Sequence, residues 1–322
     1  MNIYLTLDYE LFMGLESGTV KNCLIKPMNR LIERTSEFGV LFTLFVDAAY
    51  LYRLSILKCQ HATLQKDYDD IVLNLQWLAK IGHSIQLHIH PQWYFSTYEK
   101  GKWQIDQSHY KLSDIPYSDL NELFAKSKLL LEKIIGNRVT AFRAGGYSIQ
   151  SLKNYTEFLA YNNIFVDSSA ASGQEYKSNY QWYDYRNVKS GRIYRFSNDI
   201  TKYDTEGKLI EYPISCIHIS TIRYVIYRLY IKFLKNIGKP FGDGLAVPAN
   251  RKLGLLDTRI INYSIDYVMA PMLFSSLTNI SKSGQEDIVL IGHPKNQSEE
   301  SIEELRNFII KTKYLATYKT IK

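Results

Sequence analysis

The sequence predicts an α/β protein built on parallel strands. Apolar runs alternate along the chain with segments of helical periodicity, which is the pattern of repeated β-α-β units. Several of the apolar runs stop in polar, ionisable or glycine residues, as expected where active-site groups gather at the carboxyl ends of parallel strands. One of these strand ends, in the stretch 82–93, holds three of the chain's seven histidines within eight residues.

The first strand is predicted over residues 1–7. Ile3, Leu5 and Leu7 lie on one side of it, and the strand ends in Asp8-Tyr9-Glu10, which places two carboxylates on the other side. The next three elements are predicted as a helix over 27–38 with Gly39 as its stop, a strand over 40–46 that runs into Asp47, and a helix over 67–80 closed by Gly82.

The strand that follows carries the histidines. Alternate side chains of an extended segment share a face, so His88 and His90 point the same way, while Leu87 and Ile89 face the other layer. Neutral imidazole is the commonest metal ligand, and two imidazoles need only an acidic oxygen donor and a water to complete an open catalytic site. The alternative is that His83 caps a turn and the other two are hydrogen-bonded histidines inside the fold.

The middle of the chain continues the alternation. A long loop rich in tryptophan and tyrosine is predicted over 92–117, on the active-site side. The elements predicted after it are a helix over 118–135, a strand over 139–142 that runs into Arg143, a helix over 150–161, a strand over 164–166 that runs into Asp167, and two strands over 192–198 and 208–215, the second of which contains Glu211.

The last third contains one unusual helix. Residues 217–239 predict a helix with Arg228, Lys232, Lys235 and Lys239 on one narrow stripe and apolar residues opposite. This is either an ordinary solvated face over a core-facing one or a helix that rests on an anionic membrane. The final elements are predicted as a loop over 240–256, a helix over 264–281, a strand over 288–291 that runs into His293, and a helix opened by Ser298.

Composition limits the class of protein. The chain of 322 residues is 46% apolar and 14% aromatic, which suits one large domain over residues 1–322 with an insertion at about 217–286. The net charge of +7 is spread along the chain without a basic block, so we expect no nucleic-acid partner. We also expect no signal peptide, and a cytoplasmic location that fits the three unpaired cysteines Cys23, Cys59 and Cys216.

The predicted strand ends carry the groups of a hydrolytic metal site. Two histidines and one carboxylate give three protein ligands, and a position left for water lowers that water's pKa from 15.7 to about 7. A second carboxylate could take the water's proton, and His293 could protonate the group that departs. Arg143 is suited to hold a carboxylate through its planar fork.

In these residues the sequence resembles the polysaccharide deacetylases of the NodB-homology type, which are carbohydrate esterases built on a distorted (β/α)7 barrel. Five short motifs carry the resemblance, in the family's order and through most of the chain: Leu5-Thr6-Leu7-Asp8-Tyr9-Glu10, the histidine stretch 82–91, Phe142-Arg143-Ala144-Gly145-Gly146-Tyr147, Val166-Asp167-Ser168-Ser169, and Leu290-Ile291-Gly292-His293-Pro294. Within the family it is similar to the divergent branch found among O-antigen and capsule biosynthesis genes.

The resemblance implies a metal-dependent deacetylase that removes an acyl group, N-acetyl above all, from a saccharide in surface-glycan biosynthesis. It implies that the catalytic residues are Asp8 as general base, Arg143 as the group that positions Asp8, and His293 as general acid. It implies that Glu10, His88 and His90 bind a divalent metal, with zinc expected. The saccharide could be nucleotide-linked, lipid-linked or a polymer, and the enzyme could touch the inner face of the membrane through 217–239.

This chain departs from the family's pattern in two ways. The family usually has two adjacent aspartates where Tyr9 separates Asp8 from the longer Glu10, and its metal histidines are usually four residues apart where His88 and His90 are two apart. The side chains expected to contact the sugar are Trp93, Tyr147, Asp167 and Glu211. Two other functions stay open: a glycoside hydrolase on a related distorted barrel, with two carboxylates across a sugar and no obligatory metal, and a glycan-binding relative without turnover.

Overall fold

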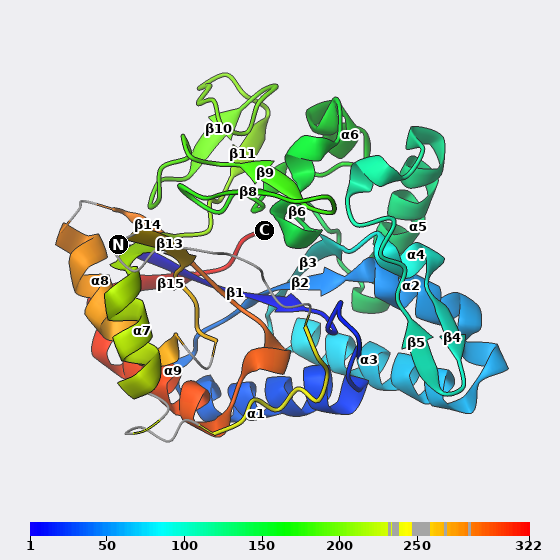
Figure 1. The fold of residues 1–322 in the computed structure, drawn as a ribbon, viewed down its shortest axis with the longest axis horizontal. Helices are drawn as coiled ribbons and strands as arrows, with labels where there is room; N and C mark the ends of the chain where they lie inside the picture. Colours follow the sequence, from blue (N-terminus) through cyan, green and yellow to red (C-terminus); the bar gives the residue numbers. More distant parts are fainter. Residues whose placement is uncertain (231–232, 234–237, 247–257, 267–268, 283–284) are drawn as a thin grey trace.

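The computed structural model describes residues 1–230, 233, 238–246, 258–266, 269–282 and 285–322. Its centre is a curled, mixed sheet with the strand order β10-β11-β7-β6-β3-β2-β1-β14, and β15 pairs with β1 beside this path. All of the pairings in this sheet are parallel except that of β10 with β11. Figure 1 shows α1, α3 and α9 along one side of the sheet and β8–β11 above it. This is the α/β fold that the sequence predicts.

The strands of the described parts have these bounds: β1 Asn2–Tyr9, β2 Thr43–Asp47, β3 Ser84–Ile89, β4 Thr97–Glu99, β5 Lys102–Gln104, β6 Ala141–Ala144, β7 Val166–Asp167, β8 Glu175–Lys177, β9 Trp182–Asp184, β10 Tyr194–Phe196, β11 Leu209–Glu211, β12 Cys216–Ser220, β13 Thr258–Asn262, β14 Asp287–Gly292 and β15 Thr317–Lys319. The α-helices have these bounds: α1 Lys26–Thr35, α2 Ala48–Leu57, α3 Ala62–Lys80, α4 Gln92–Phe95, α5 Tyr117–Ile135, α6 Tyr155–Tyr161, α7 Thr221–Tyr230, α8 Leu273–Lys282 and α9 Glu299–Thr312.

The predicted helix boundaries hold where capping chemistry defines them. Gly39 follows α1 and its short 3-10 extension with φ of 64°, and Gly136 follows α5 with φ of 71°. A left-handed residue of this kind ends a helix at little steric cost when it is glycine. Ser298 begins α9, because its hydroxyl accepts a hydrogen bond from the Ser301 backbone N–H at 3.2 Å. The buried face of α9 includes Leu305 and Phe308.

Several predictions of local structure were wrong or incomplete, among them the start of the predicted helix 150–161, since α6 begins at Tyr155. The segment 92–117 contains α4, the β4–β5 hairpin and a 3-10 turn in place of one long loop, and α2 was not predicted. The start of the predicted helix 217–239 is strand β12, which pairs with β13, so the helix begins at Thr221. In the predicted helix 264–281, residues 264–266 are not helical, Ala270–Met272 form a 3-10 turn, and α8 begins at Leu273, while residues 267–268 lie outside the described residues. Residues 231–232 and 234–237 of the predicted helix 217–239 also lie outside the described residues.

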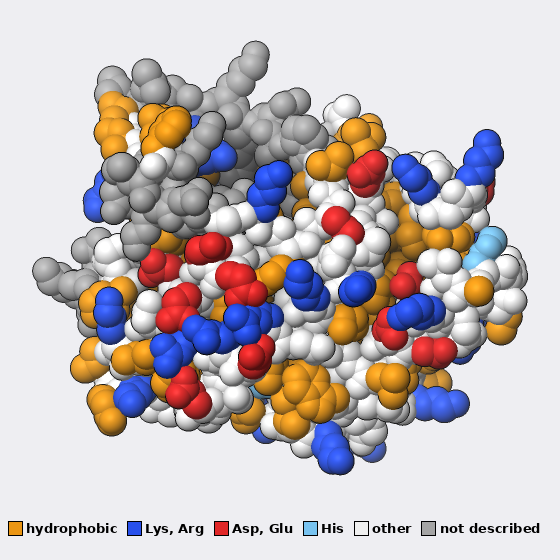
Figure 2. Space-filling model, turned by 90° about the horizontal axis from the view of Figure 1, so that it is seen from below, with side chains coloured by type: hydrophobic (Ala, Val, Ile, Leu, Met, Phe, Trp, Pro, Cys, Tyr) orange, Lys and Arg blue, Asp and Glu red, His pale blue; other side chains and the backbone are white. Residues whose placement is uncertain are grey.

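The outer face is held together by ion pairs between distant segments. Arg30 pairs with Glu299 at 2.8 Å, Arg34 pairs with Glu303, and Arg306 pairs with Glu37 at 3.0 Å, so α1 and the short turn after it are joined to α9. Figure 2 shows acidic and basic side chains interleaved on this face. None of the helices in the described parts of the chain combines the length and the apolar character that crossing a bilayer requires.

Candidate active site

The site is built at the carboxyl ends of the central strands. Asp8 and Glu10 lie on the same side of the β1 strand end, while Tyr9 between them points to the helical layer, where its hydroxyl donates a hydrogen bond to the Asn74 Oδ1 at 3.1 Å. This alternation is the one that an extended backbone imposes. β1 and β3 both pair with β2, so the end of β3 delivers His88 and His90 to the same rim.

Glu10, His88 and His90 converge on one point. The Glu10 Oε2 lies 3.0 Å from the His88 Nε2 and 2.7 Å from the His90 Nε2, and one donor atom from each residue lies within 4.8 Å of the others. All three side chains are buried. Tetrahedral ligands at the usual zinc distances are about 3.3 Å apart. The three donors therefore fit a divalent metal with only a small outward adjustment.

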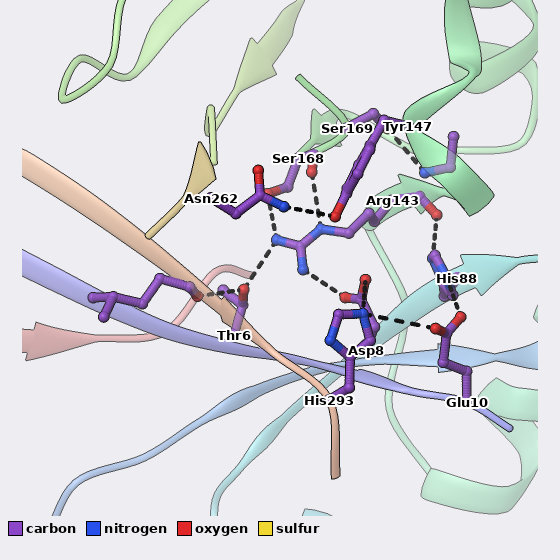
Figure 3. Close-up of polar contacts among 12 residues, drawn as sticks. Thr6, Asp8, Glu10, His88, Arg143, Tyr147, Ser168, Ser169, Asn262 and His293 are labelled. Carbon is purple, nitrogen blue, oxygen red and sulfur yellow. Dashed lines mark hydrogen bonds and ion pairs between the residues drawn. The ribbon is translucent and has the colours of Figure 1, made fainter. Parts of the chain in front are cut away.

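The orientation of His88 supports the same interpretation. Its Nδ1 lies 2.7 Å from the Arg143 carbonyl oxygen, which requires the Nδ1 to carry the proton and leaves Nε2 free to act as a ligand (Figure 3). Burial lowers the pKa of His88, but Asp8 and the hydrogen bond to Glu10 more than offset this, and its pKa is raised to about 9. In the absence of a metal, His88 therefore carries a second proton at neutral pH, which a metal displaces.

Lys295 is a site residue that the sequence analysis missed. Its buried ammonium donates hydrogen bonds to the Glu10 Oε1 at 2.8 Å and to the Leu11 carbonyl oxygen at 2.7 Å. Burial raises the pKa of Glu10, but Lys295 and His90 lower it by a larger amount, so the net pKa is well below its ordinary value. Glu10 is thus a carboxylate whose Oε1 is held by Lys295 and whose Oε2 faces the two histidines. The signal that could have identified Lys295 is its position, two residues after His293 and three after the end of β14.

Arg143 is fully buried behind Asp8. Its Nη1 donates to the Asp8 Oδ1 at 2.6 Å, and its Nη2 donates to the Thr6 and Ser168 hydroxyls at 3.0 and 2.9 Å (Figure 3). The guanidinium also stacks over the Phe45 ring at 4.1 Å from its centroid. These contacts fix the plane of Arg143 and, through it, one oxygen of Asp8.

His293 faces both carboxylates from the end of β14. Its Nε2 lies 3.8 Å from the Asp8 Oδ2 and 3.7 Å from the Glu10 Oε1. On the other side of the ring, Nδ1 lies 2.9 Å from the Asp266 Oδ2, and Asp266 also accepts the His293 backbone N–H at 2.8 Å. Burial lowers the pKa of His293, but Asp266 more than offsets this and the pKa is raised. Asp266 was missed because it falls inside the predicted helix over 264–281.

Asp167 and Glu211 lie behind the site and are not on its surface. They are adjacent in the pairing of β7 with β11, and both are completely buried. Burial raises the pKa of Asp167 to about 6, and burial together with Asp167 raises the pKa of Glu211 well above its ordinary value. Glu211 accepts the Ala170 backbone N–H at 3.1 Å. The prediction that these two residues contact the sugar does not agree with their complete burial.

Asp47 and Trp93 are buried, whereas Tyr147 is only half-buried. The Asp47 Oδ1 accepts the backbone N–H of Tyr50 at the start of α2 and that of His90. Trp93 is fully buried against Tyr50 and Trp103, so its ring offers no face to a sugar, contrary to the prediction. Tyr147 is half-buried beside Arg143, and its hydroxyl accepts a hydrogen bond from the Asn262 Nδ2 at 2.9 Å (Figure 3).

A cavity of about 400 Å³ adjoins the site, and its wall includes His293, Asp266, Asn262, Gln174, Tyr224 and Arg228. A larger groove of about 1090 Å³ lies between α1 and α3, and its wall contains none of Asp8, Glu10, His88, His90 and His293. The smaller cavity is the one that reaches the site, because His293 and Asp266 lie in its wall.

Comparisons with known proteins place this geometry in a fold family. A polysaccharide deacetylase from Mycobacterium smegmatis superposes with a TM-score of 0.56 at 15% identity, over 99% of this chain and 86% of that one. A polysaccharide deacetylase from Pseudomonas aeruginosa PAO1 superposes with a TM-score of 0.50 at 9% identity, over 99% and 87% of the two chains. The chain has the fold of polysaccharide deacetylases. The fold expected from the five motifs, including the distorted barrel, is thereby confirmed.

The same fold also carries other chemistry. The GH57 branching enzyme of Thermococcus kodakaraensis superposes with a TM-score of 0.52 at 11% identity, over 99% of this chain and 69% of that one. No family model matches the sequence, and no curated protein matches it. Because likeness at such low identity establishes only the fold, the function has to be argued from the site.

Proposed function

We propose that this protein is a metal-dependent hydrolase that removes an acyl group, most specifically N-acetyl, from a saccharide. The observation that carries the proposal is that the buried side chains of Asp8, Glu10, His88 and His90 meet the partly exposed His293 in one cluster at the rim of the sheet. Deacetylase neighbours on the same fold support it. A divalent metal, for which we propose zinc, would be held by Glu10, His88 and His90 and would supply a Lewis acid that activates water and polarises the acyl carbonyl.

Asp8 is proposed as the general base. Arg143 occupies its Oδ1, which leaves Oδ2 to accept the proton of the attacking water. Arg143 thus positions Asp8 without taking part in the proton transfer, since its guanidinium stays charged throughout. Proton transfer to a positioned group of this kind contributes a rate factor of about 10²–10⁴.

His293 is proposed as the general acid. Asp266 orients its ring and favours the imidazolium, so the Nε2 proton is available to the departing amine nitrogen when the C–N bond breaks. One proton leaves the water for Asp8 and one leaves His293 for the amine, and the products are acetate and a free amino sugar. The His293 Nε2 and the Asp8 Oδ2 lie 3.8 Å apart, so the proposed acid and base can both reach one reacting group.

The biological setting is a finer proposal. We propose a role in surface-glycan biosynthesis at a cytoplasmic location, in line with the motif resemblance to O-antigen and capsule enzymes. Peripheral contact with the membrane through 217–239 belongs to this proposal. A saccharide is the proposed partner in each case.

Acetate release tests the proposed activity. The purified chain is treated with a chelator, reloaded with zinc and incubated with N-acetylated oligosaccharides, and acetate and free amine are measured. We expect zinc-dependent release that falls at least about 100-fold in Asp8→Asn and His88→Ala. His218→Ala, a change at an exposed histidine on β12, is the matched control and should keep full activity.

Two outcomes contradict the proposal. Cleavage of a glycosidic bond without metal would favour the glycoside hydrolase, and saccharide binding with neither metal nor acetate release would favour a glycan-binding relative. Full activity in Asp8→Asn or His88→Ala would also refute the assigned site.

A further inference from the structure

Helix α7 turns an apolar stripe toward solvent. Ile222, Val225, Ile226 and Leu229 are spaced at three and four residues, so they share one face of the helix, and they are 41%, 39%, 60% and 50% exposed. A helix on the surface of a globular protein normally buries such a stripe. Here the more buried residues are Thr221, Tyr224 and Tyr227, on the opposite face.

Positive charge borders this stripe on both sides. At 100° per residue, Arg223 falls on one flank of the apolar face and Arg228 on the other, and both are exposed. The sequence contains no acidic residue between Glu211 and Asp243, while Lys232, Lys235 and Lys239 follow in the same stretch. An apolar face between cationic flanks matches a surface that is apolar inside and anionic outside, which is the interface of an anionic bilayer.

The inner side of α7 borders the active site. Tyr224 and Arg228 form part of the wall of the cavity that also contains His293 and Asp266. The Arg259 guanidinium from β13 lies 5.0 Å from the Tyr224 ring centroid and donates a hydrogen bond to the Thr221 hydroxyl, so the base of α7 is attached to the hairpin that lines the cavity. Figure 1 shows α7 at one edge of the fold.

We propose that α7 seats the protein on an anionic lipid surface and that the cavity beside His293 takes a saccharide carried on a lipid. The first half of this proposal, binding of α7 to lipid, rests only on the exposed apolar stripe and the positive charges beside it. The second half rests on the proposed deacetylase function, because it names the substrate class of that site. The helix lies in the interface with its axis along the membrane plane and does not cross the bilayer.

Vesicle sedimentation tests the first half. The full chain is mixed with phosphatidylcholine vesicles with and without phosphatidylglycerol, at low and high salt. We expect binding that requires phosphatidylglycerol and weakens with salt. Ile226→Glu should lower the affinity for vesicles by about tenfold or more, because it removes an apolar side chain that the bilayer would bury and adds a negative charge that the anionic lipids repel. Arg223→Gln and Arg228→Gln should each lower it by about fivefold.

Leu129→Glu is the matched control, since Leu129 is 65% exposed on α5 and the change in charge is the same. It should bind vesicles as the unaltered protein does. Binding that ignores phosphatidylglycerol, or no binding at all, would overturn the proposal. So would a dimer in light scattering that Ile226→Glu dissolves, because a second copy would then cover the stripe.

Turnover tests the second half. An N-acetylated saccharide coupled to a phospholipid is presented in the same vesicles, beside the soluble saccharide. Ile226→Glu should reduce turnover of the vesicle-borne substrate at least about tenfold and leave turnover of the soluble one unchanged. Equal turnover of the vesicle-borne substrate by both proteins would refute the inference. Failure of the deacetylase proposal would show as no turnover of either substrate, while vesicle binding would still report on α7.

Discussion

Replacing Lys295 with methionine should destabilise the metal-free protein more than the metal-loaded protein. Lys295 is the only lysine or arginine in the described parts of the chain that forms an ion pair with Glu10, and both side chains are buried. Methionine keeps most of the length and apolar volume of lysine but has no charge. In the metal-free protein the change therefore leaves the buried Glu10 carboxylate with only the two histidine side chains, of which His88 is protonated, as ionic partners. A metal at the Glu10 Oε2 supplies the missing positive charge.

The size of the effect follows from the two contacts of the ammonium. Breaking a buried ion pair by removing one partner costs about 3–5 kcal/mol. With a metal bound, the main remaining loss is the hydrogen bond to the Leu11 carbonyl oxygen, which contributes about 2 kcal/mol. The difference, about 2 kcal/mol, must appear as tighter metal binding by the variant, because linkage is reciprocal. It corresponds to roughly 30-fold in the dissociation constant.

Urea unfolding with a chelator and with saturating zinc measures both free energies, and a zinc titration measures the affinity directly. Lys66→Met is the control, since Lys66 forms an exposed ion pair with Asp70 on α3 and should behave the same with and without zinc. An equal loss of stability for Lys295→Met in both conditions, or weaker zinc binding, would refute the assignment of Glu10 as a metal ligand.

Three further predictions concern protonation and packing. Zinc affinity should rise from pH 6 to pH 8 and zinc binding should release protons, because the pKa of His88 is raised to about 9 without metal; a pH-independent affinity in calorimetry would contradict this. Glu211→Gln should be at least as stable as the unaltered protein at pH 8 in urea unfolding. Because the pKa of Glu211 is raised in the folded protein, folding takes up a proton, and the unaltered protein loses stability as the pH rises above the pKa of Glu211 in the unfolded chain. Marked destabilisation by the substitution would argue for a buried carboxylate. Trp93→Phe should lower the melting temperature and leave KM for the saccharide unchanged, since Trp93 packs in the core; a raised KM with unchanged stability would restore it to the sugar site.

The local sequence could predict the residues that stand at strand ends. Asp8, Glu10, His88 and His90 each follow an apolar run of period two, so both their face and their end of the sheet can be read from the pattern. His293 follows the last such run. The strand order is less accessible, because only tertiary packing decides that β1 and β3 both pair with β2.

Residues outside that pattern could not be predicted in the same way. Lys295 lies in a short 3-10 turn and Asp266 in an irregular segment, and charged residues in such segments are usually exposed to water. Their burial depends on contacts with Glu10 and His293 that are far away in the sequence. The prediction for Trp93 differs from the structure in the opposite way, because a residue expected at an exposed sugar site is buried. An aromatic residue next to a catalytic motif suggests a sugar contact, but Tyr50 and Trp103, which cover it, come from elements that the sequence analysis did not predict.

The two departures from the family's motif compensate for each other in this geometry. Residues two apart on a strand share a face, so Asp8 with Glu10 and His88 with His90 form two pairs that face one space across β2. Adjacent acids would point to opposite sides of an extended segment, and the intervening Tyr9 avoids this by packing toward α3. Glutamate reaches about 1.5 Å further than aspartate. That extra reach lets Oε2 approach both imidazoles, whose ring centroids are 4.8 Å apart at an interplanar angle of 80°. A longer acid and a closer histidine pair thus bring together the same three kinds of donor that the resemblance implies.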